Sequence, residues 1–319
     1  MDIEASVYIA DHHGLIGSAL RDKLSQLGCA KIISDPPGAF TLRDAKLVDR
    51  LFSRARPEFV FLIGGASGGI GANQKRPADL MLDNLLVNCH VIENARRYGT
   101  RKLLYLGSSC SYPKFVEQPM RVDSLMSGGL EPTNESYGIA KLAGLYLCRA
   151  YRQQFQAEFI TAVPANVFGP GDDFSAEDSH VIAALMRRMH EAKSARQSEV
   201  VIWGSGLPRR EFILAEDMAD ACIFLMDHYD EAEPVNVGAG ADWCIRELAE
   251  MIAEVVGFAG NLVFDRSKPD GMPAKLLDSS VLQTMGWRPK TSLKEGLIRT
   301  YQWFTHEGTI RERNAGPIL

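Results

Sequence analysis

Long hydrophobic runs are absent from the 319-residue sequence, and so is an excess of basic residues. No apolar stretch approaches the ~18 residues that a membrane-spanning helix needs, and Met1 to Glu4 contain no basic segment ahead of an apolar one. The sequence has 35 Lys and Arg against 40 Asp and Glu, a net charge of −5. We therefore expect neither a membrane nor a nucleic acid as a partner.

Paired cysteine spacings are also lacking. The six cysteines are widely scattered, which argues against a metal site and against the disulfide framework of a small secreted domain. Hydrophobic residues at 46% and charged residues at 24% are ordinary for a globular protein. We expect a reduced, cytoplasmic protein without a metal. The cysteines are Cys29, Cys89, Cys110, Cys148, Cys222 and Cys244.

Short apolar runs alternate with helical patterns in the first half of the chain. Ile16, Leu20 and Leu24 repeat at the spacing of a helix that packs on a sheet. A strand–helix–strand rhythm of this kind is typical of a parallel sheet. We predict an α/β fold, a Rossmann-like doubly wound parallel sheet with a smaller C-terminal α/β lobe. The expected strands are residues 7–10, 31–34, 59–63, 103–106 and 159–163.

The first predicted turn carries part of a dinucleotide-binding motif. Gly14 and Gly17 fit the positions that let the backbone approach a pyrophosphate and let the helix pack closely on the strand. Asp11 replaces the first glycine, and an aspartate can adopt a left-handed backbone. We expect Gly14, Leu15, Ile16 and Gly17 to contact a dinucleotide at the helix amino terminus. A generic strand–helix turn is the alternative.

The end of the second predicted strand bears on the choice of cofactor. Asp35 lies 18 residues beyond Gly17, close to the ~20 expected of an acid that binds a ribose 2′-hydroxyl. An acid there favours NAD over NADP, because a 2′-phosphate would meet like charge. A turn aspartate before two prolines is the alternative. A glycine-rich loop at 64–69 places more backbone at the same crevice.

A catalytic pattern follows the fourth predicted strand. Ser108 stands at the strand end, and Tyr137 and Lys141, four residues apart, share one face of a predicted helix. A lysine ammonium beside a phenol is expected to lower its pKa from ~10 toward neutrality. A nearby serine hydroxyl can then bind the carbonyl on which the proton is exchanged. The three residues together predict a dehydrogenase or reductase site.

The rhythm changes after about residue 170. A predicted helix carries His180 and Arg188, and helical apolar spacing returns at 245–256 and 293–304, without a low-complexity linker. We predict an NAD(P)-binding domain over 1–170 and a mainly substrate-binding lobe over 171–319, with about 211–240 returning to the first domain.

Five further stretches of the sequence form specific motifs, at 106–114, 131–141, 179–182, 203–212 and 268–278. The last two read Trp-Gly-Ser-Gly-Leu-Pro-Arg-Arg-Glu-Phe and Lys-Pro-Asp-Gly-Met-Pro-Ala-Lys-Leu-Leu-Asp. On these motifs the sequence resembles, from residue 8 to 304, the GDP-L-fucose synthase family, the GDP-4-keto-6-deoxy-D-mannose 3,5-epimerase/4-reductases of the extended short-chain dehydrogenase/reductase superfamily. The motifs are far more discriminating than those of the superfamily.

The resemblance implies roles for the catalytic residues. Cys110 and His180 match the pair that exchanges protons at C3 and C5 of the keto-sugar, with the thiolate as base and the imidazole as donor. Tyr137 would give its proton to the C4 oxygen during NADP(H)-dependent reduction. Ser108 would orient that oxygen, and Lys141 would hold the nicotinamide ribose.

The resemblance also implies which residues bind a GDP-sugar. Two phosphates and a guanine call for cationic side chains and an aromatic face. Arg187 is hard to separate from its neighbour Arg188 by sequence, and solvated surface charge is the alternative for each residue. The matching positions are Asn166, Arg188, Trp203, Arg210, Lys275 and Asp278, of which Asn166 and Asp278 match less well.

The departures from the family cluster on the cofactor side. They leave NAD(H) open as the alternative to NADP(H). A GDP-4-keto dideoxy sugar or heptose is the alternative substrate, and a non-catalytic nucleotide sensor the alternative class. We expect a homodimer paired through helices near 79–97 and 137–155, as in the superfamily. The departing positions are Asp11, His13, residues 35–37, Ala66 and Ala274.

Overall fold

The computed structural model describes residues 1–35 and 41–308. Its main sheet has six parallel strands in the order β2-β1-β3-β4-β5-β9, which confirms the predicted doubly wound α/β fold. Pro36 and Pro37, the two prolines that follow Asp35, lie outside the described residues. The strands are β1 Val7–Ala10, β2 Ile32–Ile33, β3 Phe59–Leu62, β4 Lys102–Leu106, β5 Glu158–Pro164 and β9 Val235–Val237.

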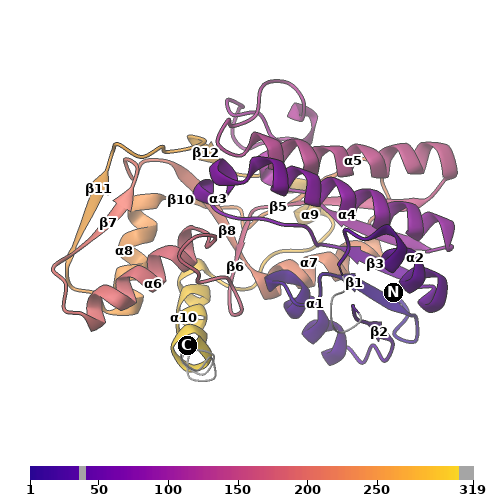
Figure 1. Ribbon diagram of the computed structural model, residues 1–319, viewed down its shortest axis with the longest axis horizontal. Coiled ribbons are helices and arrows are strands. Elements are labelled where there is room, and N and C mark those ends of the chain that lie inside the picture. The colour runs from indigo at the N-terminus through magenta and orange to yellow at the C-terminus, as the bar shows by residue number, and fades with distance from the viewer. Residues whose placement is uncertain (36–40, 309–319) are drawn as a thin grey trace.

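Helices cover both faces of this sheet (Figure 1). Helices α4 and α5 lie side by side on one face, with α2 against α4, while α1 packs against α7 on the other. This arrangement buries both sides of the strands, which explains why their sequences are continuously apolar. The helices are α1 Leu15–Gln26, α2 Ala45–Ala55, α3 Ile70–Lys75, α4 Pro77–Arg97, α5 Glu135–Phe155 and α7 Ala215–His228.

A second set of elements lies beside the carboxyl ends of the main strands. Strand β8 pairs with β6, β10 and β12, and β7 pairs with β11 at the far left of Figure 1. The helices of this lobe are α6 Val181–Ser194, α8 Ile245–Val256 and α10 Leu293–Trp303, whereas α9 Ser280–Thr284 packs against β9 of the main sheet. Its strands are β6 Asn166–Phe168, β7 Glu199–Trp203, β8 Arg209–Leu214, β10 Asp242–Cys244, β11 Asn261–Asp265 and β12 Ala274–Lys275.

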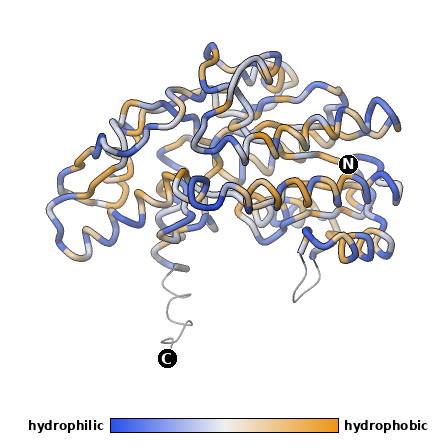
Figure 2. The backbone as a smooth tube through the Cα atoms, turned by 45° about the horizontal axis from the view of Figure 1, so that its top comes forward, coloured by the Kyte–Doolittle hydropathy of each residue, from blue (hydrophilic) through white to orange (hydrophobic). Residues whose placement is uncertain are grey.

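The buried hydrophobic residues form two clusters, one around the six-stranded sheet and one among α6, α8, α10, β7 and β8. Figure 2 shows hydrophobic and hydrophilic residues alternating along the long helices, as expected of helices with one face on a core. No helix in the described ranges is long and apolar enough to cross a membrane. The division of the chain near residue 170 stays a prediction.

One predicted helix begins later than expected. His180 was placed within a helix, but α6 starts at Val181 and His180 precedes it with an extended backbone (φ −75°, ψ 168°). That prediction is wrong because the apolar spacing that indicated the helix does not locate its first residue. Because His180 precedes α6, its side chain is not packed against the other residues of the helix and can take part in a site.

Candidate active site

A cavity of about 1630 Å³ opens between the carboxyl ends of the parallel strands and the second lobe. It exceeds the ~300–1,000 Å³ typical of drug-sized ligands, so a dinucleotide and a nucleotide sugar can occupy it together. The structure brings most of the predicted site residues to its walls. These are Gly14, Leu15, Ile16, Gly17, Ser108, Cys110, Tyr137, Lys141, Asn166, His180, Arg188, Trp203, Arg210 and Lys275.

The turn after β1 has the backbone that a dinucleotide needs. Asp11 has a φ of 74°, the left-handed conformation predicted for it. A Cβ on Gly17 would lie 2.1 Å from the Asp11 carbonyl oxygen, so the close approach of α1 requires glycine. Gly14 precedes α1 without a side-chain cap, which leaves the first N–H groups of the helix available to an anion. The turn therefore fits a pyrophosphate.

The Asp11 carboxyl group is the unusual member of this turn. A Cβ on Gly14 would lie 2.8 Å from Asp11 Oδ2, so the carboxylate sits directly beside the phosphate-binding glycine. Burial, followed by the charge of Asp35, raises the pKa of Asp11 to about 6. The repulsion of a phosphate by this carboxyl group is thereby reduced near pH 6.

Asp35 is held by two residues that the sequence did not indicate. The Tyr8 hydroxyl donates to Asp35 Oδ1 at 2.6 Å, and His12 Nδ1 lies 3.3 Å from Oδ2. Asp35 is not among the residues that line the cavity. Tyr8 belongs to an apolar strand, and its sequence pattern indicates only a core residue. The charge of Asp35 nevertheless acts on Asp11, which does line the cavity.

Ser108, Cys110 and Tyr137 meet at the end of β4. Ser108 hydrogen-bonds to the Tyr137 phenol, and its hydroxyl oxygen accepts the Cys110 N–H at 3.1 Å. Desolvation, together with the nearby Cys110, raises the pKa of Tyr137 above its ordinary value. The predicted lowering of this pKa by Lys141 is therefore wrong for this structure. A phenol that stays protonated is suited to donating its proton.

Lys141 reaches from α5 to the ends of two strands. Its ammonium donates to the Leu106 carbonyl oxygen at 3.2 Å and to that of Gly64 at 3.4 Å. Burial lowers the pKa of Lys141 to about 8, against the charges of Asp11 and Asp83. Because backbone carbonyl groups occupy the ammonium, its charge does not act on Tyr137 as the spacing predicted.

Cys110 lies among hydrogen-bond donors. Lys275 Nζ is 3.2 Å from the sulfur and Asn134 Nδ2 is 3.3 Å from it. Burial alone would raise the pKa of the Cys110 thiol, but Lys275, Ser108 and Arg210 together bring it below its ordinary value. Lys275 was predicted to bind substrate, and the structure places it on the thiol.

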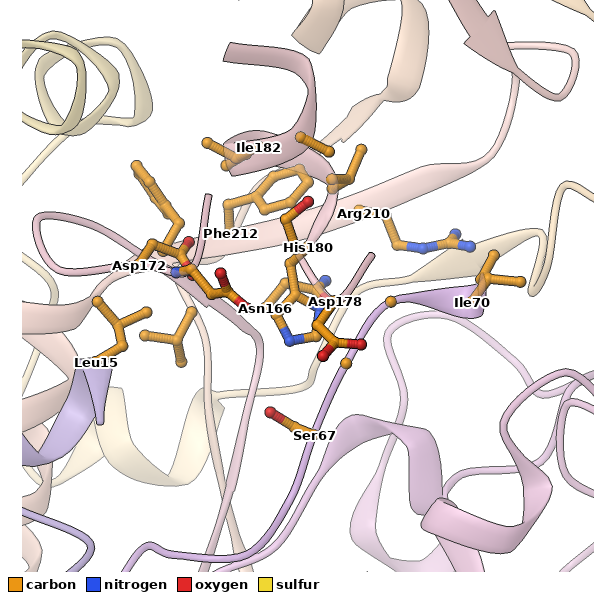
Figure 3. A pocket seen from close by; sticks show the side chains of 18 of the residues that line it. Leu15, Ser67, Ile70, Asn166, Asp172, Asp178, His180, Ile182, Arg210 and Phe212 are labelled. Carbon is orange, nitrogen blue, oxygen red and sulfur yellow. The ribbon is translucent and has the colours of Figure 1, made fainter. Parts of the chain in front are cut away.

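His180 opens into the cavity from the residue before α6, and Figure 3 shows its ring near Asn166 and Asp178 with Arg210 beyond. Desolvation by the surrounding walls lowers the pKa of His180, although the charge of Asp173 acts in the opposite direction. An imidazole in this position can accept and release a proton through its ring nitrogens.

The cationic and aromatic residues predicted for the substrate lie in the second lobe. Arg188 on α6 donates to the Val201 carbonyl oxygen, and Arg210 on β8 donates to that of Arg209 at 2.8 Å. Trp203 is 53% exposed and lines the cavity, so its ring is available to a base or sugar. Arg187, the alternative to Arg188, is paired with Glu191 at 2.8 Å.

The two weaker substrate predictions have different outcomes. Asn166 lines the cavity and donates through Nδ2 to the Glu211 carbonyl oxygen at 2.8 Å. Asp278 does not line the cavity, and its carboxylate instead accepts the Ser280 N–H at 3.0 Å. The motif around 268–278 reaches the cavity through Lys275, while Asp278 shapes the turn into α9.

Asn134 and Asp172 were not predicted as site residues. Asn134 belongs to the matched stretch 131–141, so its place beside Cys110 could have been suspected from that motif. Asp172 lines the cavity and is 8% exposed, and burial raises its pKa to about 7. Only packing reveals this carboxyl group, because a Gly-Asp-Asp turn otherwise indicates a surface loop.

Known proteins are similar to this chain in sequence and in fold. The sequence profile of the NAD dependent epimerase/dehydratase family matches residues 7–238. The chain therefore belongs to the NAD dependent epimerase/dehydratase family, and it is an enzyme, not a sensor. It is 50% identical over 304 residues to the probable GDP-L-fucose synthase 1 of Oryza sativa subsp. japonica, covering 95% of this chain and 93% of that protein. The predicted resemblance to the GDP-L-fucose synthases is confirmed.

Two solved structures from Campylobacter jejuni are similar over the whole fold. A GDP-6-OMe-4-keto-L-xylo-heptose reductase has a TM-score of 0.91 and 32% identity, covering 96% of this chain and 99% of that one. A GDP-mannoheptose C4 reductase with NADP bound has a TM-score of 0.87 and 33% identity, with the same coverage.

Proposed function

We propose that this enzyme converts a GDP-4-keto-6-deoxy-mannose-type sugar to GDP-L-fucose, by epimerisation at C3 and C5 and NAD(P)H-dependent reduction at C4. The observation that carries the proposal is the single cavity that Cys110, Tyr137 and His180 share. A thiol and an imidazole can serve epimerisation, and a protonated phenol can serve reduction. Similarity to a probable GDP-L-fucose synthase supports this sugar.

Epimerisation uses the acidity of protons next to a ketone. The Cys110 thiolate takes a proton from C3 or C5, and the negative charge moves to the C4 oxygen. His180 in its protonated form then delivers a proton to the opposite face of the same carbon, which inverts it. The imidazole regains a proton from solvent and the thiol loses one to it before the second carbon reacts. The cationic surroundings of Cys110 favour the thiolate that this step requires.

Reduction uses the residues at the end of β4. A bound NAD(P)H would supply the hydride to C4. Tyr137 gives its proton to the C4 oxygen, and Ser108, which is hydrogen-bonded to Tyr137, orients that oxygen. Lys141 would hold the nicotinamide ribose from its position at the strand ends.

The nucleotides are held by the two lobes. Gly14 to Gly17 would bind the cofactor pyrophosphate at the amino terminus of α1. Arg188, Arg210 and Trp203 would hold the GDP moiety. Similarity to an NADP-bound reductase supports NADP(H), whereas the carboxylate of Asp35 favours NAD(H).

Replacing Asp35 with alanine tests this choice. Removing this negative charge should lessen the repulsion of a 2′-phosphate and raise affinity for NADPH relative to NADH roughly tenfold. Equilibrium binding of both cofactors to the parent and to D35A measures the ratio. Asp22→Ala, which removes an exposed aspartate on α1, is the matched control. An unchanged ratio in D35A would show that Asp35 has no part in cofactor choice.

We also propose a cytoplasmic homodimer. All six cysteines are free, which suits a reducing compartment. Helices α4 and α5 lie together and expose Leu82, Ile139, Tyr146 and Phe155, each at least 39% accessible. Apolar residues gathered on two adjacent helices are the kind of surface that a second copy covers.

The function is tested by incubating the purified enzyme with GDP-4-keto-6-deoxymannose and NAD(P)H in deuterated water. The expected product is GDP-L-fucose with solvent deuterium at C3 and C5. Reduction without deuterium at these carbons would identify a simple 4-reductase, the activity named for the structurally similar heptose enzymes. If the enzyme catalyses no exchange and no reduction, this sugar is excluded as its substrate.

A further inference from the structure

The Lys275 ammonium has an unusual partner for a buried cation. Lys275 lies on β12, which pairs in parallel with β8, and its side chain is only 6% exposed. A buried ammonium is costly unless an anion or several acceptors compensate it. Within residues 1–35 and 41–308 no carboxylate forms an ion pair with Lys275, and the contact that the structure gives its Nζ is the Cys110 sulfur at 3.2 Å.

We propose that Lys275 holds Cys110 as a thiolate in the resting enzyme, and so acts as a positioning residue for the base and not as a ligand of the GDP phosphates. Among the described residues, the Cys110 thiolate is the anion that the structure places within hydrogen-bond distance of this ammonium. Asn134 supports the pair, because its Nδ2 reaches the same sulfur at 3.3 Å from the residue that precedes α5. The catalytic consequence rests on the proposed role of Cys110.

The other groups that face Cys110 favour the same ionisation state. Arg210, on the strand beside Lys275, adds a second positive charge, and the Ser108 hydroxyl a hydrogen bond. Tyr137 is uncharged at neutral pH because its pKa is raised. The carboxylate of Glu131, which acts on Arg210, is paired with Lys114 at 3.0 Å. His180, whose pKa is lowered, adds little charge.

The first step of epimerisation moves one proton from the sugar to Cys110. The C–H bond at C3 or C5 breaks, and its proton forms an S–H bond on Cys110. The electron pair of the broken bond passes to the C4 oxygen, so the negative charge leaves the sulfur and appears on the substrate. Before the transfer the Lys275 ammonium donates to the sulfur, where its charge favours the thiolate.

The thiolate can be measured without any sugar. The ultraviolet absorbance of thiolate is titrated against pH, with C110S subtracted to isolate Cys110. In Lys275→Met the midpoint should rise by at least about one pH unit, since neighbouring cations can lower a thiol pKa from ~8.5 to between ~3.5 and ~7.5. Lys275→Arg should restore most of the shift. Lys294→Met, an exposed lysine on α10 paired with Glu254, should change nothing.

A second readout separates the two roles of Lys275. The proposal expects K275M to lower the rate of iodoacetamide alkylation at Cys110 near neutral pH and to leave GDP affinity within about twofold of the parent. If the thiolate midpoint of K275M is unshifted and its GDP binding is weaker, the proposal is overturned and Lys275 is a ligand of the GDP phosphates. If K275M fails to fold, Asn134→Ala should still raise the midpoint by a smaller amount, because Asn134 Nδ2 reaches the same sulfur. A parent enzyme in which Cys110 titrates as an ordinary thiol, with no further shift in N134A, would overturn the proposal.

This test is independent of the proposed function. If the parent enzyme has a thiolate at low pH that depends on Lys275, but catalyses no deuterium exchange with the keto-sugar, the ion pair is supported and the proposed substrate is wrong. If Cys110 titrates as an ordinary thiol in a parent enzyme that exchanges both protons, the ion pair is wrong and the proposed substrate is supported.

Discussion

Tyr137→Phe is expected to lower kcat for keto-sugar reduction by about 10²- to 10⁴-fold, the usual contribution of a positioned general acid. The phenylalanine ring keeps the packing but has no proton for the C4 oxygen, and it also leaves Ser108 without its phenol partner. Oxidation of NAD(P)H during turnover measures the rate. The KM for the sugar and the affinity for the cofactor should change little, because the lost interaction forms mainly in the transition state.

Tyr146→Phe is the matched control for this variant. Tyr146 lies on the same helix as Tyr137 and is 39% exposed, so loss of its hydroxyl group should leave kcat unchanged. A Y137F enzyme that folds like the parent and reduces the sugar at the parental rate would remove Tyr137 from the proton-donor role.

The raised pKa of Tyr137 gives the reduction a defined pH dependence. A phenol whose pKa lies above ~10 stays protonated through the neutral range, so Tyr137 itself sets no limit to the rate there. Lys141, with a pKa of about 8, loses its charge at a lower pH than Tyr137 loses its proton. Between the two groups, the lysine is the first to change its charge as the pH rises.

The parallel sheet was predictable because each of its strands is a short apolar run followed by a helical pattern. The turn after the first strand was predictable for a similar reason. A tight turn allows few backbone conformations, and these require a glycine at Gly17 and a left-handed residue at Asp11. Ser108, Tyr137 and Lys141 were found in the same way, from a strand end and a four-residue helical spacing.

Long-range contacts and ionisation could not be obtained from spacing. Lys275 lies 165 residues from Cys110 in the sequence, and the two meet because β12 pairs with β8 beside the end of β4. The pKa of Tyr137 depends on which atoms surround the phenol, and a Tyr-x-x-x-Lys pattern does not specify where the ammonium points. Asp278 shows the same limit, because a motif places its members near a site without directing every side chain into it.

Cys110→Ala is expected to reduce deuterium incorporation at C3 and C5 by about 10²- to 10⁴-fold, because it removes the proposed base for these protons. Incubating the keto-sugar with the enzyme in deuterated water, without a reduced cofactor, isolates the exchange from reduction. Mass spectrometry gives the number of deuterium atoms, and NMR gives their positions. Cys89→Ala, which removes an exposed thiol on α4, is the matched control.

His180→Asn separates removal of a proton from its delivery. With Cys110 intact, the thiol can take a proton from the sugar and return a deuteron to the same face, so exchange should persist while inversion is lost. C110A should show neither. Exchange at the parental rate in C110A, or inversion in the H180N enzyme, would mean that other groups move these protons. The two variants together assign one face of the sugar ring to the sulfur and the other to the imidazole.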